Sequence, residues 1–375
     1  MKNMQLLARR LAQAVGLLLV TSMLVGCAAD RNVIGIDSAQ VPSADVEGAT
    51  REKIFIASTR KATDKTGALF SEQRASTVGL ASVEVSIPPT HVIGNLERAV
   101  QMPPDPRTEF AVVDPTVYAT DQAFISAVNA ELAKRPKRER NLMVFVHGYN
   151  NTTSDSVLRS AQFVNDSGYE GVVVLFDWAS AGKLSRYVYD LNSTLVARGL
   201  LAEIHSILQR TQAENYDIFA HSMGGFLIME AIRDAVKDNK LNTSGKLQNV
   251  VLASPDIDID LFRTQMAVIG DKLANFYILL SDDDRALAFS RVIGGGVPRV
   301  GAANAVELAD LGVTVIDLTE IDDSSSGSHS KFAGSPEAVQ LLGNGMNRHS
   351  RFDRESTSAR LQELIASTAI VVVGN

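Results

Sequence analysis

The sequence predicts an α/β protein with a doubly wound, mostly parallel sheet of about eight strands and helices on both faces. Short apolar runs alternate along the chain with segments whose apolar residues recur every three or four positions. Most of the runs are apolar at successive positions, which is typical of strands that helices cover on both sides. The composition agrees, because 45% of the 375 residues are hydrophobic and 21% are charged, as in ordinary globular proteins.

Eight apolar runs are predicted as strands. The second alternates apolar and polar residues and ends before Pro88 and Pro89, which cannot donate backbone hydrogen bonds. The others are mostly continuous, and the central ones are rich in valine and isoleucine, which favour strands. In chain order the runs cover residues 54–57, 80–87, 142–146, 172–176, 216–220, 250–253, 276–280 and 313–318.

Five helices are predicted between these strands, because their apolar residues recur at spacings of three and four. They cover residues 121–134, 153–166, 193–211, 224–237 and 259–273. No repeat and no proline- or serine-rich break follows residue 50. We therefore expect a single domain over residues 51–375.

Residues 1–26 are predicted as a secretory signal peptide. Lys2, Arg9 and Arg10 form a basic start, and a short apolar stretch follows up to Gly26. That stretch is short for a membrane-spanning helix, which needs about 20 residues. Residues 27–50 have no sustained period and are predicted as a flexible tether.

Cys27 is the only cysteine in the chain, and it directly follows Leu24, Val25 and Gly26. The tetrapeptide Leu24–Cys27 resembles the bacterial lipobox. The resemblance implies a lipoprotein that is cleaved before Cys27 and acylated at Cys27, with palmitate among the attached acyl chains. Several acyl chains would anchor the protein firmly in a membrane. We therefore expect a lipid-anchored protein of the bacterial cell envelope, and Ala28 in place of aspartate favours the outer over the inner membrane. The alternative is a plain signal anchor with a chance cysteine.

Charge and residue types exclude several classes of function. The formal net charge is −7, whereas nucleic-acid binding needs a basic surface. A single thiol can form neither an internal disulfide nor a cysteine metal site, and no histidine pair has metal-ligand spacing. No nucleic-acid partner, metal or cofactor is therefore expected.

The most specific catalytic motif is AHSMGG at residues 220–225, which directly follows one predicted strand and opens a predicted helix. A nucleophile elbow has this strand-turn-helix context, with small residues two positions before and after the serine. Here these are Ala220 and Gly224, the alanine replacing the more usual glycine. Ser222 is therefore the predicted nucleophile. The alternative is a tight serine turn without catalysis.

Two backbone amides are predicted to form an oxyanion hole, which stabilises the negative charge of the tetrahedral intermediate. One is the amide of Met223, at the start of the helix. The other is the amide of Tyr149, because Gly148 lets the chain turn sharply after the strand at 142–146. The alternative is that His147 and Gly148 merely end that strand. His147 and His221 belong to rigid turns and are interpreted as supporting residues.

The general base that a serine nucleophile needs is predicted to be His329. Of the six histidines, only His329 and His349 follow the last predicted strand. His329 lies in a Ser- and Gly-rich loop, a usual place for the base. His349 lies among Asn347, Arg348 and Arg351 and is interpreted as solvated surface.

The acid that orients the base is predicted to be Asp284, after the strand at 276–280. Asp283 is the second choice. Asp256, after the strand at 250–253, is the third, and we interpret it as capping the helix that begins near Ile259. Adjacent carboxylates repel one another when they are buried, so the other aspartates of this run are expected to face water.

The body of the chain resembles a bacterial α/β-hydrolase family of unknown function within the esterase/lipase group. The resemblance implies the α/β-hydrolase fold and supports Asp284 as the acid. The chain departs from the family at Ala179, where proline is common after Trp178. The matching segments span residues 51–342 and are 55–60, 79–88 with His91 and Gly94, 144–150, 176–182, 220–225, 253–256, 277–287 with Ser290, 299–301, and His329.

We therefore expect a serine hydrolase that cleaves small-molecule acyl esters through an acyl-serine intermediate, with the membrane as its second partner. The segment 178–198, with Tyr187 and Tyr189, is expected to form a wall of the pocket. Thioester and amide substrates and the oligomeric state stay open. The alternative function is that of a non-catalytic envelope lipoprotein that uses a hydrolase scaffold for binding or assembly.

Overall fold

The computed structural model describes residues 33–272, 275–322, 327–347 and 371–373. The predicted signal peptide at 1–26 and the predicted lipidation site Cys27 lie outside these residues, and so does His349. Within the described part of the chain, no helix is both long and apolar enough to cross a bilayer.

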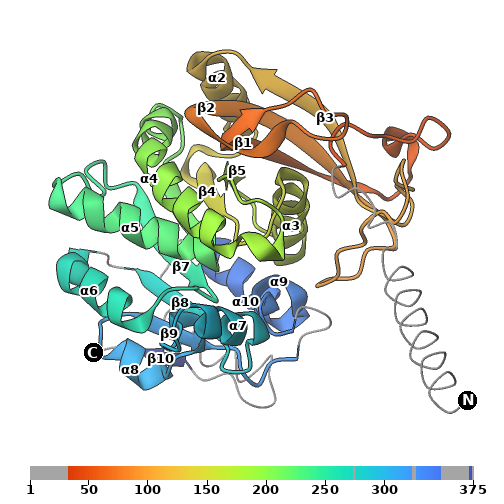
Figure 1. The fold of residues 1–375 in the computed structure, drawn as a ribbon. Coiled ribbons are helices and arrows are strands. Elements are labelled where there is room, and N and C mark those ends of the chain that lie inside the picture. Colours follow the sequence, from red (N-terminus) through yellow and green to blue (C-terminus); the bar gives the residue numbers. More distant parts are fainter. Residues whose placement is uncertain (1–32, 273–274, 323–326, 348–370, 374–375) are drawn as a thin grey trace, which may run out of the picture. The chain divides into compact units, whose positions relative to one another are not determined.

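A ten-stranded sheet forms the centre of the fold (Figure 1). Its order is β10-β9-β8-β7-β6-β4-β5-β1-β2-β3, with β2, β3 and β10 antiparallel to their neighbours and the other strands parallel. The predicted mostly parallel α/β sheet is confirmed, and each of the eight predicted strands overlaps an observed one. The bounds are β1 Thr50–Ala62, β2 Phe70–Ile87, β3 Ala111–Tyr118, β4 Asn141–Val146, β5 Val172–Asp177, β6 Asn215–His221, β7 Leu247–Ala253, β8 Phe276–Leu280, β9 Thr314–Asp317 and β10 Val371–Val373.

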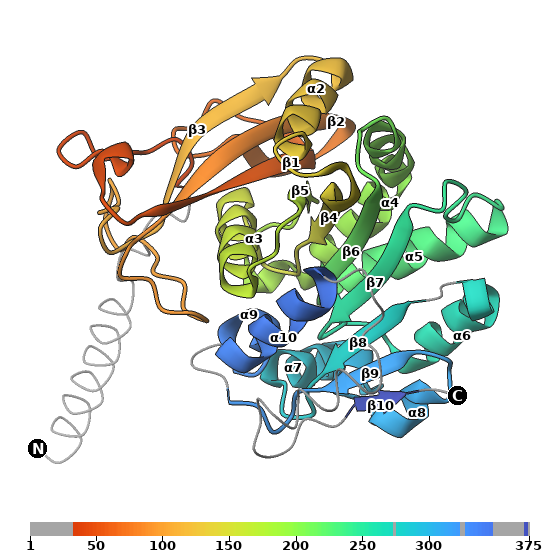
Figure 2. The same ribbon diagram turned by 180° about the vertical axis from the view of Figure 1, so that it is seen from behind.

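Helices cover both faces of the sheet (Figures 1 and 2). One apolar core lies between the sheet and α2 (Asp121–Leu132), α4 (Tyr187–Gln209), α5 (Met223–Lys237) and α6 (Ile259–Ile269). The other lies between the sheet and α3 (Thr153–Ser167), α9 (Lys331–Gly334) and α10 (Pro336–Asn347). Along the chain, the short helices α7 (Arg285–Ile293) and α8 (Ala305–Ala309) follow β8 and precede β9.

Strand β4 illustrates why the central runs are apolar at every position. Leu142 and Val144 belong to the first core, whereas Met143 and Phe145 belong to the second. Successive side chains of a strand point to opposite faces, so a strand covered on both sides needs apolar residues throughout.

Strand β3 was not predicted, and its sequence contains Pro115, which lacks a backbone donor and argues against a strand. In the structure the preceding Asp114 has a positive φ of 50°. The strand lies at the edge of the sheet, and its pairing with β2 shifts register at this point. An edge position tolerates such an irregularity, because only one side of the strand needs a partner.

The predicted tether is wrong from Val33 onward. Val33 and Ile34 are buried in the second core, and Ser43 is also buried. The backbone N–H of Val33 donates to Ser154 Oγ at 3.1 Å, and that of Gly35 donates to the Val112 carbonyl at 2.8 Å. A single apolar pair creates no period, which is why sequence patterning missed this packed segment.

Candidate active site

Ser222 occupies a strained turn between β6 and α5. Its φ of 54° and ψ of −123° are unfavourable for a residue with a Cβ, and such strain persists only where the surroundings enforce it. Its N–H donates to the Ala253 carbonyl at 2.9 Å. A Cβ at Gly224 would lie 2.5 Å from the His147 carbonyl oxygen, so only glycine lets the elbow pack against the end of β4. The predicted elbow geometry is therefore present.

His329 and Asp284 lie within hydrogen-bonding distance of each other, with 2.7 Å between His329 Nδ1 and Asp284 Oδ2. The carboxylate is buried. Its other oxygen, Oδ1, accepts from the Leu287 N–H at 2.9 Å and caps α7. Both carboxylate oxygens are thus held, which fixes the orientation of Asp284 toward the imidazole.

The loop that carries His329 is fastened on two sides. His221 Nε2 donates to the His329 carbonyl at 3.0 Å. Burial, together with the nearby His329, lowers the pKa of His221 well below its ordinary value, so its ring is neutral. On the other side, Lys331 Nζ donates to Asp283 Oδ1 at 2.9 Å, and Ser328 Oγ donates to Asp283 Oδ2 at 2.6 Å. Asp283, the second choice for the acid, therefore holds the loop and does not contact the imidazole of His329.

The loop after β4 approaches Ser222 closely. A Cβ at Gly148 would lie 2.9 Å from the Cβ of Ser222 and 2.9 Å from His221 Nδ1. The next two residues, Tyr149 and Asn150, line the same cavity as Ser222, and Asn150 has a positive φ of 60°. The predicted need for glycine at position 148 thus has a steric cause in the structure.

A buried ion pair stabilises the loop after β4. Arg60 Nε lies 2.8 Å from Asp177 Oδ1, and both side chains are almost fully buried. Burial alone would raise the pKa of Asp177, but the Arg60 and His147 side chains lower it to about 2. Arg60 also donates to the carbonyls of Ser180, at 2.6 Å, and Asn151, at 2.9 Å. The pair therefore joins the loops that follow β4 and β5.

His147 is part of the same support, as the sequence predicted. Its ring stacks on the Trp178 ring, with 4.9 Å between centroids and an interplanar angle of 10°. Trp178 Nε1 in turn donates to the His147 carbonyl at 2.7 Å.

Ser222 and His329 line a common cavity of about 550 Å³ at the carboxyl edge of the parallel strands. This is the edge at which ligands bind in open α/β sheets. Leu184 and Tyr187 line it, so the predicted wall is present at these positions. Tyr189 points elsewhere, because its hydroxyl donates to the Glu72 carbonyl at 3.0 Å and Arg74 lies over its ring.

Asp256 also lines the cavity, but not as predicted. The cap of α6 is Asp258, whose Oδ1 accepts from the Asp260 N–H at 2.9 Å. Asp256 instead accepts from the Tyr187 hydroxyl at 2.9 Å and from Ser290 Oγ, and forms an ion pair with Arg299 at 3.4 Å. Burial beside Asp256 raises the pKa of Tyr187, which keeps its hydroxyl protonated as the donor.

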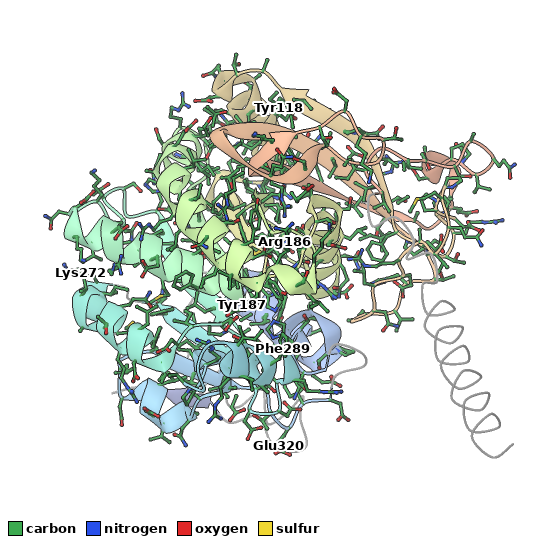
Figure 3. All side chains as sticks on the ribbon, in the orientation of Figure 1. Tyr118, Arg186, Tyr187, Lys272, Phe289 and Glu320 are labelled. Atoms are coloured by element: carbon green, nitrogen blue, oxygen red, sulfur yellow. The ribbon has the colours of Figure 1, made fainter. Side chains whose placement is uncertain are left out.

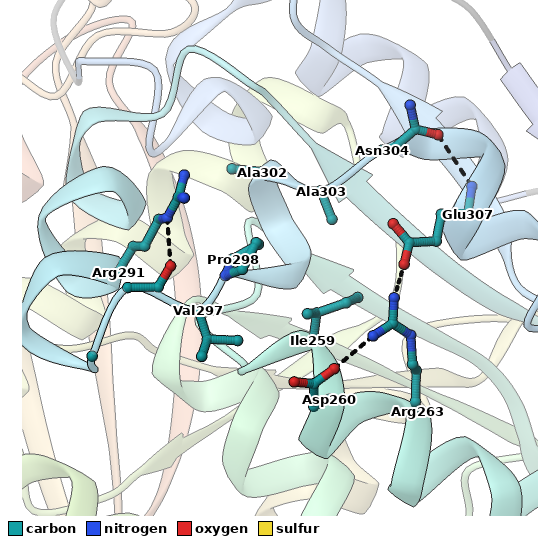
Figure 4. A pocket seen from close by; sticks show the side chains of 12 residues that line it. Ile259, Asp260, Arg263, Arg291, Val297, Pro298, Ala302, Ala303, Asn304 and Glu307 are labelled. Carbon is teal, nitrogen blue, oxygen red and sulfur yellow. Dashed lines mark hydrogen bonds and ion pairs between the residues drawn. The ribbon is translucent and has the colours of Figure 1, made fainter.

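A second cavity, of about 650 Å³, lies beside α6 and α8 (Figure 4). Arg263 is paired there with Asp260 and Glu307, and Arg291 Nε donates to the Gly296 carbonyl at 2.8 Å. Two carboxylates thus balance the charge of Arg263, and Arg291 has a backbone acceptor. Within the described ranges, no cluster of three or more His, Cys, Asp or Glu residues could hold a metal ion.

Sequence reasoning missed the polar groups that position the site. These include Lys331, which is buried although it lies two residues after His329, and the Arg60–Asp177 pair. In the sequence, Lys331 directly precedes the apolar Phe332 and Ala333, which are buried in the structure, and this position was the one available indication that Lys331 is buried. The partners of the others lie far away in the chain, so no local pattern reveals them.

The fold and the elbow define the class of protein, that of the α/β hydrolases. The family model described as "Alpha/beta hydrolase of unknown function (DUF900)" matches residues 121–345, and the chain belongs to this family. The comparison with curated proteins finds no match.

The comparison with solved structures finds esterases and lipases. An esterase of Pyrobaculum calidifontis is 12% identical, with 80% of this chain and 85% of that chain covered and a TM-score of 0.36. Lipase B of Aspergillus fumigatus is 12% identical, with 68% of this chain and 63% of that chain covered and a TM-score of 0.41.

Proposed function

We propose that the protein is a serine hydrolase that cleaves carboxylic acyl esters through an acyl-serine intermediate. The observation that carries the proposal is the combination of a strained Ser222 at the elbow with a His329–Asp284 pair, Ser222 and His329 lining one cavity. A strained serine backed by a base and an orienting acid is the arrangement that nucleophilic acyl transfer requires.

In the proposed reaction, Ser222 Oγ attacks the ester carbonyl carbon and its proton passes to His329 Nε2. Asp284 accepts the hydrogen bond from Nδ1 and stabilises the imidazolium. The tetrahedral intermediate collapses, His329 protonates the leaving alcohol, and the acyl group stays on Ser222. A water molecule, deprotonated by His329, then releases the carboxylic acid and restores the serine. These steps need no cofactor.

The proposed oxyanion hole consists of the amides of Met223 and Tyr149. Met223 is the first residue of α5, and a helix leaves its first amides without intrahelical acceptors. The helix dipole adds partial positive charge at the same point. Tyr149 follows Gly148, which approaches Ser222 closely. Both positions favour amides that stabilise a developing negative charge.

The test is a Ser222→Ala variant compared with Ser126→Ala, an exposed serine on α2. We expect Ser222→Ala to lose fluorophosphonate labelling and p-nitrophenyl ester hydrolysis while keeping its melting temperature. The control should keep both activities. Wild-type turnover in Ser222→Ala would refute the proposed nucleophile, and a native chain inert to the phosphonate and to ester, thioester and amide panels would favour a non-catalytic binding role.

We further propose that Cys27 anchors the protein in the bacterial envelope, in the outer rather than the inner membrane. The support is the lipobox-like tetrapeptide that ends at Cys27. Cys27→Ser should abolish incorporation of radioactive palmitate and release the protein from membranes. A palmitate-labelled Cys27→Ser variant would contradict the anchor, and membrane fractionation of the native chain would test its location.

A further inference from the structure

One wall of the active-site cavity carries three polar side chains that bond one another. We define the Asp256 cluster as Asp256, which follows β7, Tyr187 on α4 and Ser290 on α7, and all three line the cavity. Asp256 and Ser290 are buried. Figure 3 shows Tyr187 and Phe289 on the same face of the molecule, where α4 and α7 approach each other. A few polar groups of this kind orient the ligand in an otherwise apolar pocket.

Both hydroxyl protons of the Asp256 cluster are used inside it. The Tyr187 hydroxyl donates to Asp256 Oδ2 at 2.9 Å, and Ser290 Oγ donates to Asp256 Oδ1. The two hydroxyl oxygens also lie 3.0 Å apart. Three oxygen contacts therefore share two protons, since each hydroxyl supplies one and an ionised carboxylate supplies none. Burial and the charge of Asp256 raise the pKa of Tyr187, so its proton stays in the cluster.

The Asp256 cluster therefore offers a ligand acceptors and no free donor. A carboxylate can accept about four hydrogen bonds and a hydroxyl oxygen about two, so acceptor capacity remains after the internal bonds are made. Arg299 Nε lies 3.4 Å from Asp256 Oδ1 and offsets the charge of the carboxylate. Asp258 lies further from Arg299, at 4.0 Å, and is partly exposed to water. A neutral hydrogen-bond donor matches such a wall better than a cation does.

The other residues of the cavity do not supply an equivalent buried donor or acceptor pair. Leu184, Leu287 and Phe289 are apolar. Arg285 also lines the cavity, but it is exposed, so water competes for its donors. A buried acceptor discriminates more strongly, because an alkyl group placed against it removes water without replacing the lost hydrogen bond.

The cluster is tied directly to the backbone of the elbow. The Asp256 N–H donates to the Ser222 carbonyl at 3.2 Å. From these observations we propose that the Asp256 cluster binds a hydroxyl group of the substrate, so that the preferred substrates are hydroxylated acyl esters. The inference rests on the proposed ester hydrolysis. The hydroxyl belongs to the alcohol part or to the acyl part of the ester, a few bonds from the ester group, and the two arms of the experiment distinguish these sources.

Matched pairs of esters test hydroxyl recognition in the native chain. One arm compares 2-hydroxyethyl butyrate with propyl butyrate, and the other compares ethyl 3-hydroxybutyrate with ethyl 3-methylbutyrate. Each pair differs by a methyl group in place of the hydroxyl. We expect kcat/KM to be about tenfold higher for the hydroxylated ester in one pair, which assigns the hydroxyl to the alcohol or the acyl part. Equal kcat/KM values within both pairs would overturn the proposal.

Asp256→Asn tests the carboxylate, and Asp258→Asn is the matched control in the same loop. Asparagine keeps the shape of the side chain but brings an NH₂ donor into the cluster, so the ratio of the two kcat/KM values should fall to about one. Asp258 caps α6, which asparagine does about as well, so the control should keep the native ratio. Both variants are assayed well below their melting temperatures. A native ratio in Asp256→Asn would overturn the proposal.

Tyr187→Phe separates hydrogen bonding from a merely structural role of the cluster. The change removes a proton that Asp256 accepts and leaves the carboxylate in place, so the hydroxyl preference should stay at least at its native value. Tyr189→Phe makes the same change on the same helix, at a hydroxyl that donates to the Glu72 carbonyl, and should match the native chain. A loss of preference in Tyr187→Phe as large as in Asp256→Asn would contradict acceptance by the carboxylate.

The outcomes separate this inference from the proposed function. Hydrolysis of all four esters without a hydroxyl preference would overturn the inference and leave the esterase in place. A native chain that hydrolyses none of them would refute ester hydrolysis. In that case saturation-transfer NMR on Ser222→Ala still decides whether the cavity binds the hydroxylated ester more tightly than its methyl partner, and equal binding would overturn the inference as well.

Discussion

Asp284, which contacts His329, and Asp256, which lines the cavity, should respond to the same substitution in opposite ways. In Asp284→Asn, the side-chain oxygen can still cap α7 through the Leu287 N–H, because asparagine caps a helix about as well as aspartate. The amide NH₂ would replace the oxygen that lies 2.7 Å from His329 Nδ1. A donor there favours the tautomer that carries its proton on Nε2, which cannot accept the serine proton.

The expected loss of activity is large. The same inversion in a serine protease triad costs about four orders of magnitude in kcat. We expect kcat of Asp284→Asn to fall at least about a hundredfold, which corresponds to about 2.7 kcal/mol of transition-state stabilisation. The melting temperature should change little. Asp284→Ala should add a loss of about 1 kcal/mol of stability, because it also removes the cap.

Asp256→Asn should show the reverse pattern. It weakens the hydrogen bond from Tyr187 and leaves Arg299 buried without its nearest carboxylate. Breaking a buried pair costs about 3 kcal/mol or more, so the melting temperature should fall by several degrees while kcat stays within about tenfold. Both quantities are measured side by side on a p-nitrophenyl ester and by thermal unfolding. A larger kcat loss in Asp256→Asn than in Asp284→Asn would show that Asp284 is not the acid.

Two further predictions concern the loop beside the nucleophile and the pH dependence of stability. Gly148→Ala should lower kcat about a hundredfold, because the new Cβ meets Ser222 at 2.9 Å and displaces the loop, whereas Gly199→Ala, with open space around it, should leave kcat unchanged; equal activities would show that the close approach is not needed. Burial would lower the pKa of His91, but hydrogen bonds to Asp166 and Glu97 raise it above its ordinary value. Because the folded-state pKa is the higher one, this stabilisation is complete below the unfolded pKa and is lost as pH rises through the folded pKa. Urea unfolding at several pH values should show that loss in the native chain but not in His91→Gln, and parallel profiles would contradict it.

The sequence predicted those elements of the fold that are determined by local sequence patterns. The apolar runs follow from burial on both faces of the sheet, and the elbow follows from the small residues Ala220 and Gly224 around Ser222. Strand β3 escaped prediction because Pro115 is tolerated only at a sheet edge, and an edge is a property of the tertiary structure. The burial of Val33 and Ile34 was not predicted, because a single apolar pair forms no pattern and only the tertiary structure shows which core it enters.

The candidate site divides in the same way. The resemblance and the chain order pointed to Asp284 and His329, and the structure brings these two side chains together. The roles of the other aspartates were predicted wrongly or incompletely. Asp256 was interpreted as a helix cap, but Asp258 occupies that position and Asp256 bonds Tyr187, which lies on another helix. A pattern in one segment cannot identify a partner that another segment supplies.

The groups that orient His329 illustrate how the fold imposes chemistry on a surface loop. The loop has no regular structure at His329, so its position depends on hydrogen bonds to rigid elements. His221, directly before Ser222, donates a hydrogen bond to the His329 carbonyl, so the elbow and the loop of His329 share one contact. Asp283, directly before Asp284, accepts hydrogen bonds from Lys331 and Ser328 on either side of His329. Ser222 and Asp284 thus each have a sequence neighbour that holds the loop of His329 in place.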